Sequence, residues 1–474
     1  MDAQLGSFTA EPLHSDDGGA RLPERERHKR TRDLDSMAPP LRPLHKTRKA
    51  VAAPAKPASS WFRSSAWLVL ALLAAAAAAL LRDPQHVQHA VARALQDLNL
   101  SSAAYSQALD AADVDCASAH QFLTDVMPVK GFHVLCIETT PSNTCVALPG
   151  VAGGSGGPLR TSNDCVETAV DLVSFTQAVE VELLQIPPPQ DEYARQFKQS
   201  TAYFTPDGQR LDKKLSQLRD RIVFLFEGGQ FIWPGVRIGH KTLVKDTYGR
   251  GDLELETISM TPLVFSVEEF LRDDEIDVIL ELSTPHLKPS GVTLQDGHEN
   301  RPATDWRTST TYWLDSAAHP VVQDIDKRTA DLTKLPISHQ ESVQVLRYEH
   351  TQHYDQHLDY FSVERHRKNE DVLKKIEYGH KNRMATVFWY MSDVAKGGHT
   401  NFPRAGGLPP PPSNKGCPQG VSVAPKKRKV VVFYSMLPNG EGDPMSLHAG
   451  CPVEEGVKLS GNKWVWNKPR LADE

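Results

Sequence analysis

The chain has 474 residues, a hydrophobic content of 40% and a formal net charge of −6 at pH 7. This length is sufficient for one large domain or two ordinary ones, each with a buried core, and leaves residues for a tail or linker. The near-balanced charge does not favour nucleic acid or acidic partners for the chain as a whole, so we expect no nucleic-acid partner.

The chain begins with a basic tail. Residues 1–63 are rich in proline, arginine, lysine and serine and have no sustained apolar periodicity. A segment of this composition cannot bury enough apolar surface to offset the entropy of ordering. We therefore predict that this tail is disordered.

An apolar segment follows the tail. The eighteen residues between Arg63 and Arg82, SSAWLVLALLAAAAAALL, carry no charge, which is the lower limit for a helix that crosses a bilayer. Lysine and arginine crowd its N-terminal side, and this bias keeps the N-terminus cytoplasmic. We predict a type II signal anchor at residues 64–82. Everything after Arg82 would then lie in the lumen of the endoplasmic reticulum or the Golgi.

Two other interpretations of this segment remain open. A cleaved signal peptide requires a short leader, and about sixty residues precede the apolar run. A buried alanine-rich helix of a soluble domain is the second, although the basic tail before it and the Asp83-Pro84 break after it favour the anchor.

All six cysteines lie after the apolar segment. An even number on the translocated side is typical of disulfides formed in an oxidising lumen. The absence of a CxxC pair argues against a zinc cluster. Residues 83–250 form a stalk and cysteine-containing region of unknown role. Its four cysteines permit three pairings, among which the sequence does not choose: Cys116, Cys136, Cys145 and Cys165.

Beyond residue 255 the pattern becomes regular. Residues 267–287 place apolar side chains at helical spacing and predict a helix that covers one face of a sheet. Short runs rich in valine and aromatic residues follow, separated by glycine, proline and asparagine: VQVLRYE, TVFWYMS, VVVFYSM and KWVWN. Together they predict a mainly β domain, a sandwich or barrel with flanking helices.

One pair of residues in this domain suggests a metal site. His357 and Asp359 are two apart in a predicted strand, so their side chains share a face. A second histidine would complete a triad that leaves three positions open, which suits Fe(II) binding a co-substrate and dioxygen. His448 lies 91 residues downstream, a separation that fits donation from a distant strand of a jelly roll. Alone, a histidine and aspartate two apart are a weak signal.

The surrounding segments strengthen this signal. VLRYEHTQHYDQHLDYF, RMATVFWYMSDVAKGGHTNFP and SLHAGCPVEEGVK occur in the order and spacing of prolyl 4-hydroxylases. Over residues 257–468 the chain resembles this family. The resemblance implies a double-stranded β-helix (jelly-roll) catalytic domain over residues 255–470. It also implies hydroxylation of peptidyl proline at C4 with O2 and 2-oxoglutarate, releasing succinate and CO2.

The resemblance implies roles for residues around the iron. The residues that match the iron ligands are His357, Asp359 and His448. Lys458 matches the lysine that pairs with the far carboxylate of 2-oxoglutarate. Tyr348 and Thr400 match hydroxyl groups that help to hold the same carboxylate. L-ascorbate is the reductant that the family implies for rescue of oxidised iron.

The resemblance extends to the substrate site and to one cysteine pair. Tyr354, Arg383 and Trp464 match residues that line the peptidyl-proline site, and a proline-rich peptide or protein is the implied partner. Cys417 and Cys451 match a disulfide of the family close to the second histidine. Two buried free thiols are the alternative for this pair. The segment RTS at 307–309 also matches, without an assigned role.

Residues 425–430, PKKRKV, have the composition of a nuclear import signal. They stand where the family has a basic approach to the strand before the second histidine, on the predicted lumenal side of the anchor. We interpret them as a solvated turn. Arg428 departs from the family, in which a small residue is more usual, and this departure concerns only the geometry of the turn.

Two other functions are compatible with these residues. A related 2-oxoglutarate oxygenase acting on lysine or another residue could use the same triad. A non-catalytic jelly-roll binding module tethered to the membrane would be expected to have lost the triad or Lys458, and all four residues are present. The oligomeric state is left open.

Overall fold

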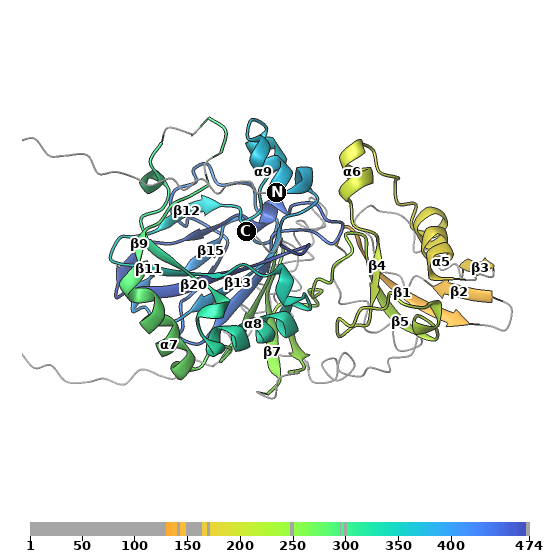
Figure 1. Cartoon of the computed structure of the whole chain (residues 1–474), viewed down its shortest axis with the longest axis horizontal. Helices are drawn as coiled ribbons and strands as arrows, with labels where there is room; N and C mark the ends of the chain where they lie inside the picture. Colours follow the sequence, from red (N-terminus) through yellow and green to blue (C-terminus); the bar gives the residue numbers. More distant parts are fainter. Residues whose placement is uncertain are drawn as a thin grey trace, which may run out of the picture. The chain divides into compact units, whose positions relative to one another are not determined.

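The computed structural model describes residues 129–139, 143–147, 164–167, 171–246, 251–293, 295–297 and 301–470 (Figure 1). The predicted tail and signal anchor lie outside these residues, as do Cys116 and the rest of residues 83–128, so these stay predictions. In the part of the chain that is described, no helix combines the length and the apolar content needed to cross a bilayer.

The C-terminal domain is built on two antiparallel sheets. The larger sheet contains β6 (Lys241–Val244), β7 (Leu253–Met260), β8 (Leu263–Val267), β9 (Lys288–Pro289), β10 (Thr310–Leu314), β11 (Val343–Tyr348), β13 (Arg383–Tyr390), β17 (Val430–Tyr434) and β20 (Lys458–Trp466). The smaller sheet contains β12 (Tyr354–His357), β15 (Thr400–Phe402), β16 (Val421–Val423) and β18 (His448–Gly450). A further pair joins β14 (Lys396–Gly397) to β19 (Val453–Glu455).

The strand order identifies the architecture. The larger sheet runs β6-β7-β8-β17-β13-β20-β11-β10-β9 and the smaller β12-β18-β15-β16. Along the chain, β11, β13, β17 and β20 of the larger sheet alternate with strands of the smaller one: β12 follows β11, β15 and β16 follow β13, and β18 follows β17. This alternation is that of a double-stranded β-helix, which confirms the predicted mainly β jelly roll. The four runs predicted as strands correspond to β11, β13, β17 and β20.

The central strands bury both faces because their side chains alternate. In β13, Val387 and Trp389 join a core cluster on the outer face, whereas Phe388 and Tyr390 join one between the two sheets. The helices α7 (Asp273–Ser283) and α8 (Pro320–Thr333), both labelled in Figure 1, add apolar side chains to the outer cluster: Ile276, Ile279, Val322, Ile325 and Leu332. The helix predicted over 267–287 is therefore present, and it covers a sheet as expected.

A buried ion pair joins α8 to the larger sheet. Lys463 of β20 is fully buried, and its Nζ lies 2.5 Å from Oδ1 of Asp326 in α8, which is itself 2% exposed. Burial lowers the pKa of Lys463, because a buried ammonium loses its hydration, and Asp326 opposes that shift. The pair fixes the helix against the strand at a point where an unpaired charge would be costly.

A second sheet precedes the jelly roll and was not anticipated from the sequence. It has the order β3-β2-β1-β5-β4. Its strands are β1 (Phe132–Thr139), β2 (Asn143–Ala147), β3 (Asp164–Glu167), β4 (Ala202–Phe204) and β5 (Arg221–Phe226), and its helices are α5 (Leu172–Ala178) and α6 (Glu192–Phe197). On β5, Val223 and Leu225 pack under α5, while Phe224 and Phe226 join the outer core cluster of the jelly roll. Cys136 of β1 is disulfide-bonded.

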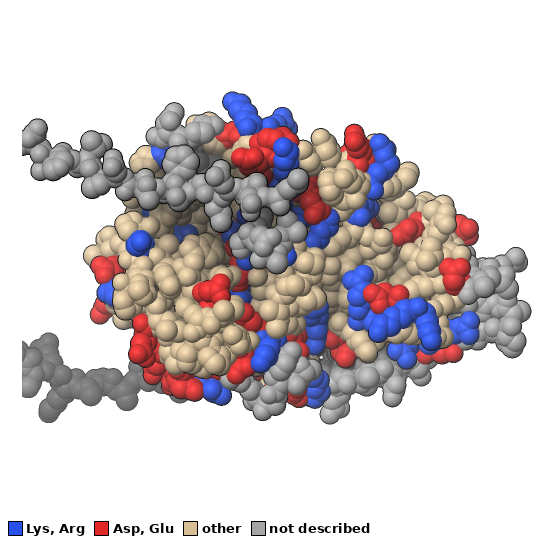
Figure 2. Space-filling view, in the orientation of Figure 1, with Lys and Arg blue, Asp and Glu red and all other residues tan. Residues whose placement is uncertain are grey.

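The basic segment 425–430 forms the predicted turn before β17. Arg428 has a φ of 76°, a left-handed conformation that favours glycine and explains why a small residue suits this position. Its guanidinium pairs with Glu269 at 2.8 Å, and Lys426 pairs with Glu268 at 2.7 Å. Acidic and basic side chains are interspersed in the same way over the face shown in Figure 2.

The ion pair between Lys463 and Asp326 yields a prediction for stability. Lys463→Met leaves the Asp326 carboxylate buried without its cation, and we expect it to lower the free energy of unfolding by about 3–5 kcal/mol. The double variant Lys463→Met/Asp326→Leu should recover most of this loss, because both charges are gone. Urea denaturation, followed by tryptophan fluorescence, measures the free energy of unfolding of the single and the double variant. A loss below about 1 kcal/mol in the single variant would contradict this account of the pair.

Candidate active site

Two histidines and one aspartate meet where β12 and β18 pair. His357 ends β12 and stands directly opposite His448, which begins β18. Asp359 lies two residues beyond His357, just past the end of the strand. Its two carboxylate oxygens are each 3.6 Å from one imidazole Nε2. The three ligand atoms lie within 4.8 Å of one another, close enough to bind a single metal ion.

Backbone carbonyls orient both imidazoles for this purpose. Nδ1 of His357 lies 2.7 Å from the carbonyl oxygen of Asp355, and Nδ1 of His448 lies 2.9 Å from that of Ser446. A carbonyl can only accept a hydrogen bond, so each Nδ1 carries the proton and each Nε2 presents a lone pair. This arrangement is the usual way in which proteins fix the tautomer of a metal-binding histidine.

The electrostatics favour the protonation states that a metal requires. Burial, with the neighbouring His448, lowers the pKa of His357 to about 3, although Asp359 acts in the opposite direction. Burial alone would raise the pKa of Asp359, but the two histidines outweigh it and hold this pKa at about 2. His357 is therefore neutral and Asp359 ionised at physiological pH, which are the forms that bind metal ions.

Thr386 of β13 supports the aspartate and was missed from the sequence. Its Oγ1 donates a hydrogen bond of 2.7 Å to Oδ2 of Asp359, and its side chain is fully buried. The strand alternation could have pointed to it, because Thr386 shares the inner face of β13 with Phe388 and Tyr390. A donor to one carboxylate oxygen leaves the other free and fixes the orientation of the group.

A buried lysine lies farther inside the jelly roll. Lys458 is 2% exposed, and its Nζ sits 5.1 to 5.5 Å from the ring centroids of Phe388, Tyr348 and Tyr390. Burial lowers its pKa to about 7. Among the described residues no carboxylate pairs with it, whereas Lys463 on the same strand has Asp326. An anion that binds beside Lys458 would meet a side chain that has already lost its hydration.

Two tyrosines beside Lys458 bring hydroxyl groups into this part of the jelly roll. Tyr348 pairs in register with Lys458, and Tyr390 donates a 2.7 Å hydrogen bond to Oγ1 of Thr400, which is also buried. Gly450 follows His448 by two residues on the same face of β18, and a Cβ there would lie 3.9 Å from the Tyr348 hydroxyl. The Tyr348 hydroxyl therefore lies close to the strand that carries His448.

On the solvent side the metal ligands open into a cavity of about 320 Å³. The cavity is lined by His357 and Asp359 together with the three residues predicted to contact substrate: Tyr354, Arg383 and Trp464. The Tyr354 ring stacks on the His357 imidazole with centroids 3.6 Å apart. The structure therefore brings the predicted metal and substrate residues together around one opening.

Two further residues hold this opening in shape: Glu341 and Arg307, neither of which was assigned a role from the sequence. Arg383 lies 3.5 Å above the Trp464 ring and donates two hydrogen bonds, of 2.6 and 2.9 Å, to Glu341. Burial would raise the pKa of Glu341, but Arg383 outweighs it and the pKa falls below its usual value. Arg307, from the RTS segment, lies 4.6 Å over the Tyr354 ring. The ion pair between Arg383 and Glu341 and the contact of Arg307 with Tyr354 each join segments that are far apart in the sequence.

Comparison with known proteins agrees with this geometry. Residues 343–466 match the family model of the 2OG-Fe(II) oxygenase superfamily, the class that the jelly roll and the His-Asp-His cluster define. Fe(II) and 2-oxoglutarate are the metal and co-substrate of this class. The chain is also 36% identical over 223 residues to the probable prolyl 4-hydroxylase 4 of Arabidopsis thaliana, covering 45% of this chain and 70% of the relative.

A second relative in Arabidopsis thaliana points the same way. The probable prolyl 4-hydroxylase 8 of Arabidopsis thaliana is 38% identical over 222 residues, covering 46% of this chain and 72% of the relative. The chain belongs to the prolyl 4-hydroxylase family. Among solved structures it is similar to a viral collagen prolyl hydroxylase from Paramecium bursaria Chlorella virus-1, at 24% identity and a TM-score of 0.31, covering 43% of this chain and 95% of that one.

The hydrogen bond from Thr386 to Asp359 can be tested directly. Thr386→Val keeps the size of the side chain but removes the donor, and we expect it to weaken metal binding by about 10- to 100-fold. Thr386→Ser retains the hydroxyl and should bind metal nearly as tightly as the natural protein. Titration with Mn(II) under anaerobic conditions compares the three proteins. Equal affinity in the valine and serine variants would show that the hydrogen bond does not position the ligand.

Proposed function

We propose that this protein hydroxylates C4 of proline residues in peptides, consuming O2 and 2-oxoglutarate and releasing succinate and CO2. The observation that carries the proposal is the placement of the His-Asp-His cluster. Two of its members line an open cavity with aromatic and arginine side chains, which is suited to a peptide, and the buried Lys458 of β20 is suited to the far carboxylate of 2-oxoglutarate. Membership of the prolyl 4-hydroxylase family supports proline as the residue attacked.

The iron would have three of its coordination positions filled by His357, Asp359 and His448. Bound Fe(II) and 2-oxoglutarate supply the oxidation of a C–H bond by O2, coupled to loss of CO2 from the co-substrate. The protein contributes the geometry. It keeps both Nε2 atoms aimed at one point, and the Tyr354 ring stacks on the His357 imidazole.

Lys458 would bind the far carboxylate of 2-oxoglutarate, with the hydroxyls of Tyr348 and Thr400 as further donors. A lysine is suited to this role because it is a compact charge with three donors. The tyrosine and threonine add hydrogen bonds without adding a second charge. Held at this end, the co-substrate would present its keto acid end toward the metal ligands.

Tyr354, Arg383 and Trp464 would line the binding site for the target proline. A proline-rich peptide in the polyproline II conformation is extended and has no internal hydrogen bonds, so it can enter a surface cavity without unfolding. The aromatic faces of Tyr354 and Trp464 match the apolar pyrrolidine ring. The ion pair with Glu341 fixes Arg383 above Trp464 and leaves the cavity wall rigid.

We further propose that the enzyme is a type II protein of the endoplasmic reticulum or Golgi membrane, anchored by residues 64–82 and using ascorbate to rescue oxidised iron. The disulfide between Cys417 and Cys451 supports the lumenal placement, because disulfides persist in oxidising compartments. Cys136 is also disulfide-bonded. Glycosylation or protease protection in microsomes tests the placement of residues 83–474.

The reaction can be tested with the full-length protein in detergent, supplied with Fe(II), 2-oxoglutarate and ascorbate. We expect succinate release that depends on a proline-rich peptide, with a gain of about 16 Da on proline. His448→Ala removes one metal ligand and should reduce turnover by at least about a thousandfold. Oxidation of a lysine peptide instead would favour a related oxygenase. Binding of peptides without any succinate would favour a non-catalytic binding module.

The pKa of Lys458 predicts how 2-oxoglutarate binding depends on pH. The free site has a pKa of about 7, and a bound carboxylate raises it, so binding takes up a proton above pH 7. The affinity for 2-oxoglutarate is therefore greatest below pH 7. Above pH 7 it falls about tenfold per pH unit until the pH reaches the raised pKa of the complex. Calorimetry of the Mn(II)-loaded protein in buffers of different ionisation enthalpy counts the protons taken up.

Lys458→Met is the control for this titration. It removes the titrating group, so its weaker binding should lose the pH dependence above pH 7 and the associated proton uptake. Retention of both in the variant would assign the titration to another group and would contradict the role of Lys458.

A further inference from the structure

Arg365 lies at the cleft that opens over the metal ligands. It lines the cavity of about 320 Å³ and an adjoining cavity of about 420 Å³, and these share six lining residues, so they form one cleft. The residue belongs to a short helical turn at Val363–His366, and its side chain is exposed. The adjacent carboxylate of Glu364 accepts a hydrogen bond from Ser362. Among the described residues none forms an ion pair with Arg365, so its charge is available to a ligand.

Arg307 brings a second positive charge to the same cleft. Its side chain lines the first cavity but is only 4% exposed. Nε donates a 3.0 Å hydrogen bond to Oγ of Ser309, and Nη2 donates one of 3.1 Å to Oε1 of Gln344. Both partners are neutral, so they satisfy the guanidinium without cancelling its charge. A charge held in such a poorly solvated place attracts an anion more strongly than a charge in water does.

Two other cations beside the cleft already have carboxylate partners. Arg383 pairs with Glu341 at 2.6 Å, and Lys415 pairs with Asp355 at 2.5 Å. Of the carboxylates that line the cleft in the described part of the chain, Asp355 is thereby neutralised and Asp359 faces the two histidines. The lining therefore has two arginines whose charge is not balanced by these carboxylates.

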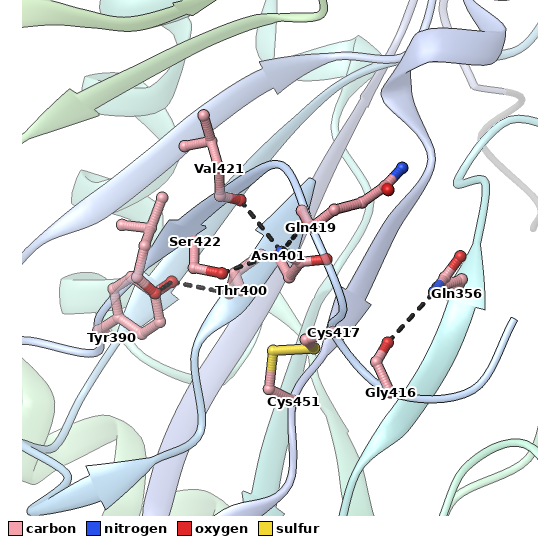
Figure 3. The surroundings of a disulfide bond; sticks show 11 residues. Gln356, Tyr390, Thr400, Asn401, Gly416, Cys417, Gln419, Val421, Ser422 and Cys451 are labelled. Carbon is pink, nitrogen blue, oxygen red and sulfur yellow. Dashed lines mark hydrogen bonds between the residues drawn. A yellow bond between two sulfur atoms is a disulfide. The ribbon is translucent and has the colours of Figure 1, made fainter. Parts of the chain in front are cut away.

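Lys415 is held in its ion pair by attachments of the residues that follow it (Figure 3). The side-chain amide of Gln356, in β12, donates a 3.2 Å hydrogen bond to the carbonyl of Gly416. The next residue, Cys417, forms a disulfide with Cys451, which directly follows β18. These two attachments fix the loop beside the smaller sheet, so Lys415 stays with its carboxylate partner.

The proposed iron and co-substrate would not consume the charge of the two arginines. The positive charges of Fe(II) and Lys458 equal the negative charges of Asp359 and the two carboxylates of 2-oxoglutarate. The loaded centre is then neutral, and Arg365 and Arg307 remain as net positive charge in the cleft. The peptide group that complements a guanidinium best is a carboxylate, because the two can form parallel hydrogen bonds.

We propose that Arg365 selects peptides that carry an aspartate or glutamate close to the target proline. The inference rests on the proposed hydroxylation of peptidyl proline and adds the charge of the preferred substrate, independently of its proline content. Arg365 would pair with the acidic side chain at the exposed side of the cleft, while Arg307 adds attraction from within. A lysine at the same place in the peptide would meet two like charges.

The test uses three peptides that share one target proline and differ only in the two residues on each side of it, which are glutamate, glutamine or lysine. Binding is measured with the Mn(II)-loaded full-length protein and an unreactive analogue of 2-oxoglutarate, and kcat/KM is measured with Fe(II) and 2-oxoglutarate. We expect the glutamate peptide to exceed the glutamine peptide about fivefold in both, the upper end for one exposed ion pair, and the lysine peptide to be the weakest. The preference should shrink as salt is raised, because ions screen exposed charges.

Matched variants assign this preference to Arg365. Arg365→Gln should reduce the ratio between the glutamate and glutamine peptides to below about twofold. Arg365→Glu should make the lysine peptide bind at least as well as the glutamate peptide, because the charge at the rim is reversed. Arg367→Gln removes the same charge from an exposed residue that lines neither cavity, so its ratio should match that of the natural protein.

The outcomes separate this inference from the proposed function. Equal binding of the three peptides by the natural protein would overturn the role of Arg365, and their turnover would leave prolyl hydroxylation intact. An unchanged preference in Arg365→Gln, or an equal loss in Arg367→Gln, would also overturn it. Tighter binding of the glutamate peptide without any gain of mass on proline would support the role of Arg365 in peptide binding and overturn the proposed hydroxylation.

Discussion

The active site depends on the register between β12 and β18, which places His357 directly opposite His448. Side chains alternate along a strand, so a slip of one residue would turn His448 toward the opposite face and separate the two imidazoles. Both strands are short, with four and three residues, and few ladder hydrogen bonds fix their pairing. Other features must therefore hold the register, and the structure supplies them from both sides of the smaller sheet.

The larger sheet provides the first of these features. Its central strands bury both faces, so their registers are fixed by two sets of apolar contacts. Phe433 of β17 lies 4.6 Å from the His448 ring, and Phe402, on β15 of the smaller sheet, lies 5.9 Å from the same ring. The second feature is the disulfide after β18, which ties this strand to the loop that also bonds to β12. Packing from within and attachment at the edge together specify where the histidines meet.

The parts of the site that could be predicted from the sequence are those carried by local pattern. The strands β11, β13, β17 and β20 stand out because valine and aromatic residues cluster between turn residues, and the triad stands out through the order of its motifs. Thr386 and Glu341 were missed, because their importance comes from partners 27 and 42 residues away. Residues of this kind have no signature of their own until the strands are paired.

The five-stranded sheet was missed for a related reason. Its central strands β1 and β5 pair over a distance of about ninety residues, from Phe132 to Phe226, with β2 and β3 between them in the chain. Strand pairing between distant segments leaves little trace in a single sequence, since each strand alone is only a short apolar run. Arg428 shows the reverse case. Its departure from the family was visible in the sequence, and the left-handed backbone at this position explains why a small residue is more usual there.

Two buried lysines on β20 show how the same residue type is used in two ways. Lys463 and Lys458 are five positions apart, so they face opposite sides of the sheet. Lys463 has a buried carboxylate partner in Asp326, and this ion pair fixes α8 against β20. Lys458 has no carboxylate partner among the described residues, its Nζ lies over the Phe388, Tyr348 and Tyr390 rings, and its pKa falls to about 7. A protein tolerates such a group only where something offsets its cost, and an anionic co-substrate is the partner that we propose for this lysine.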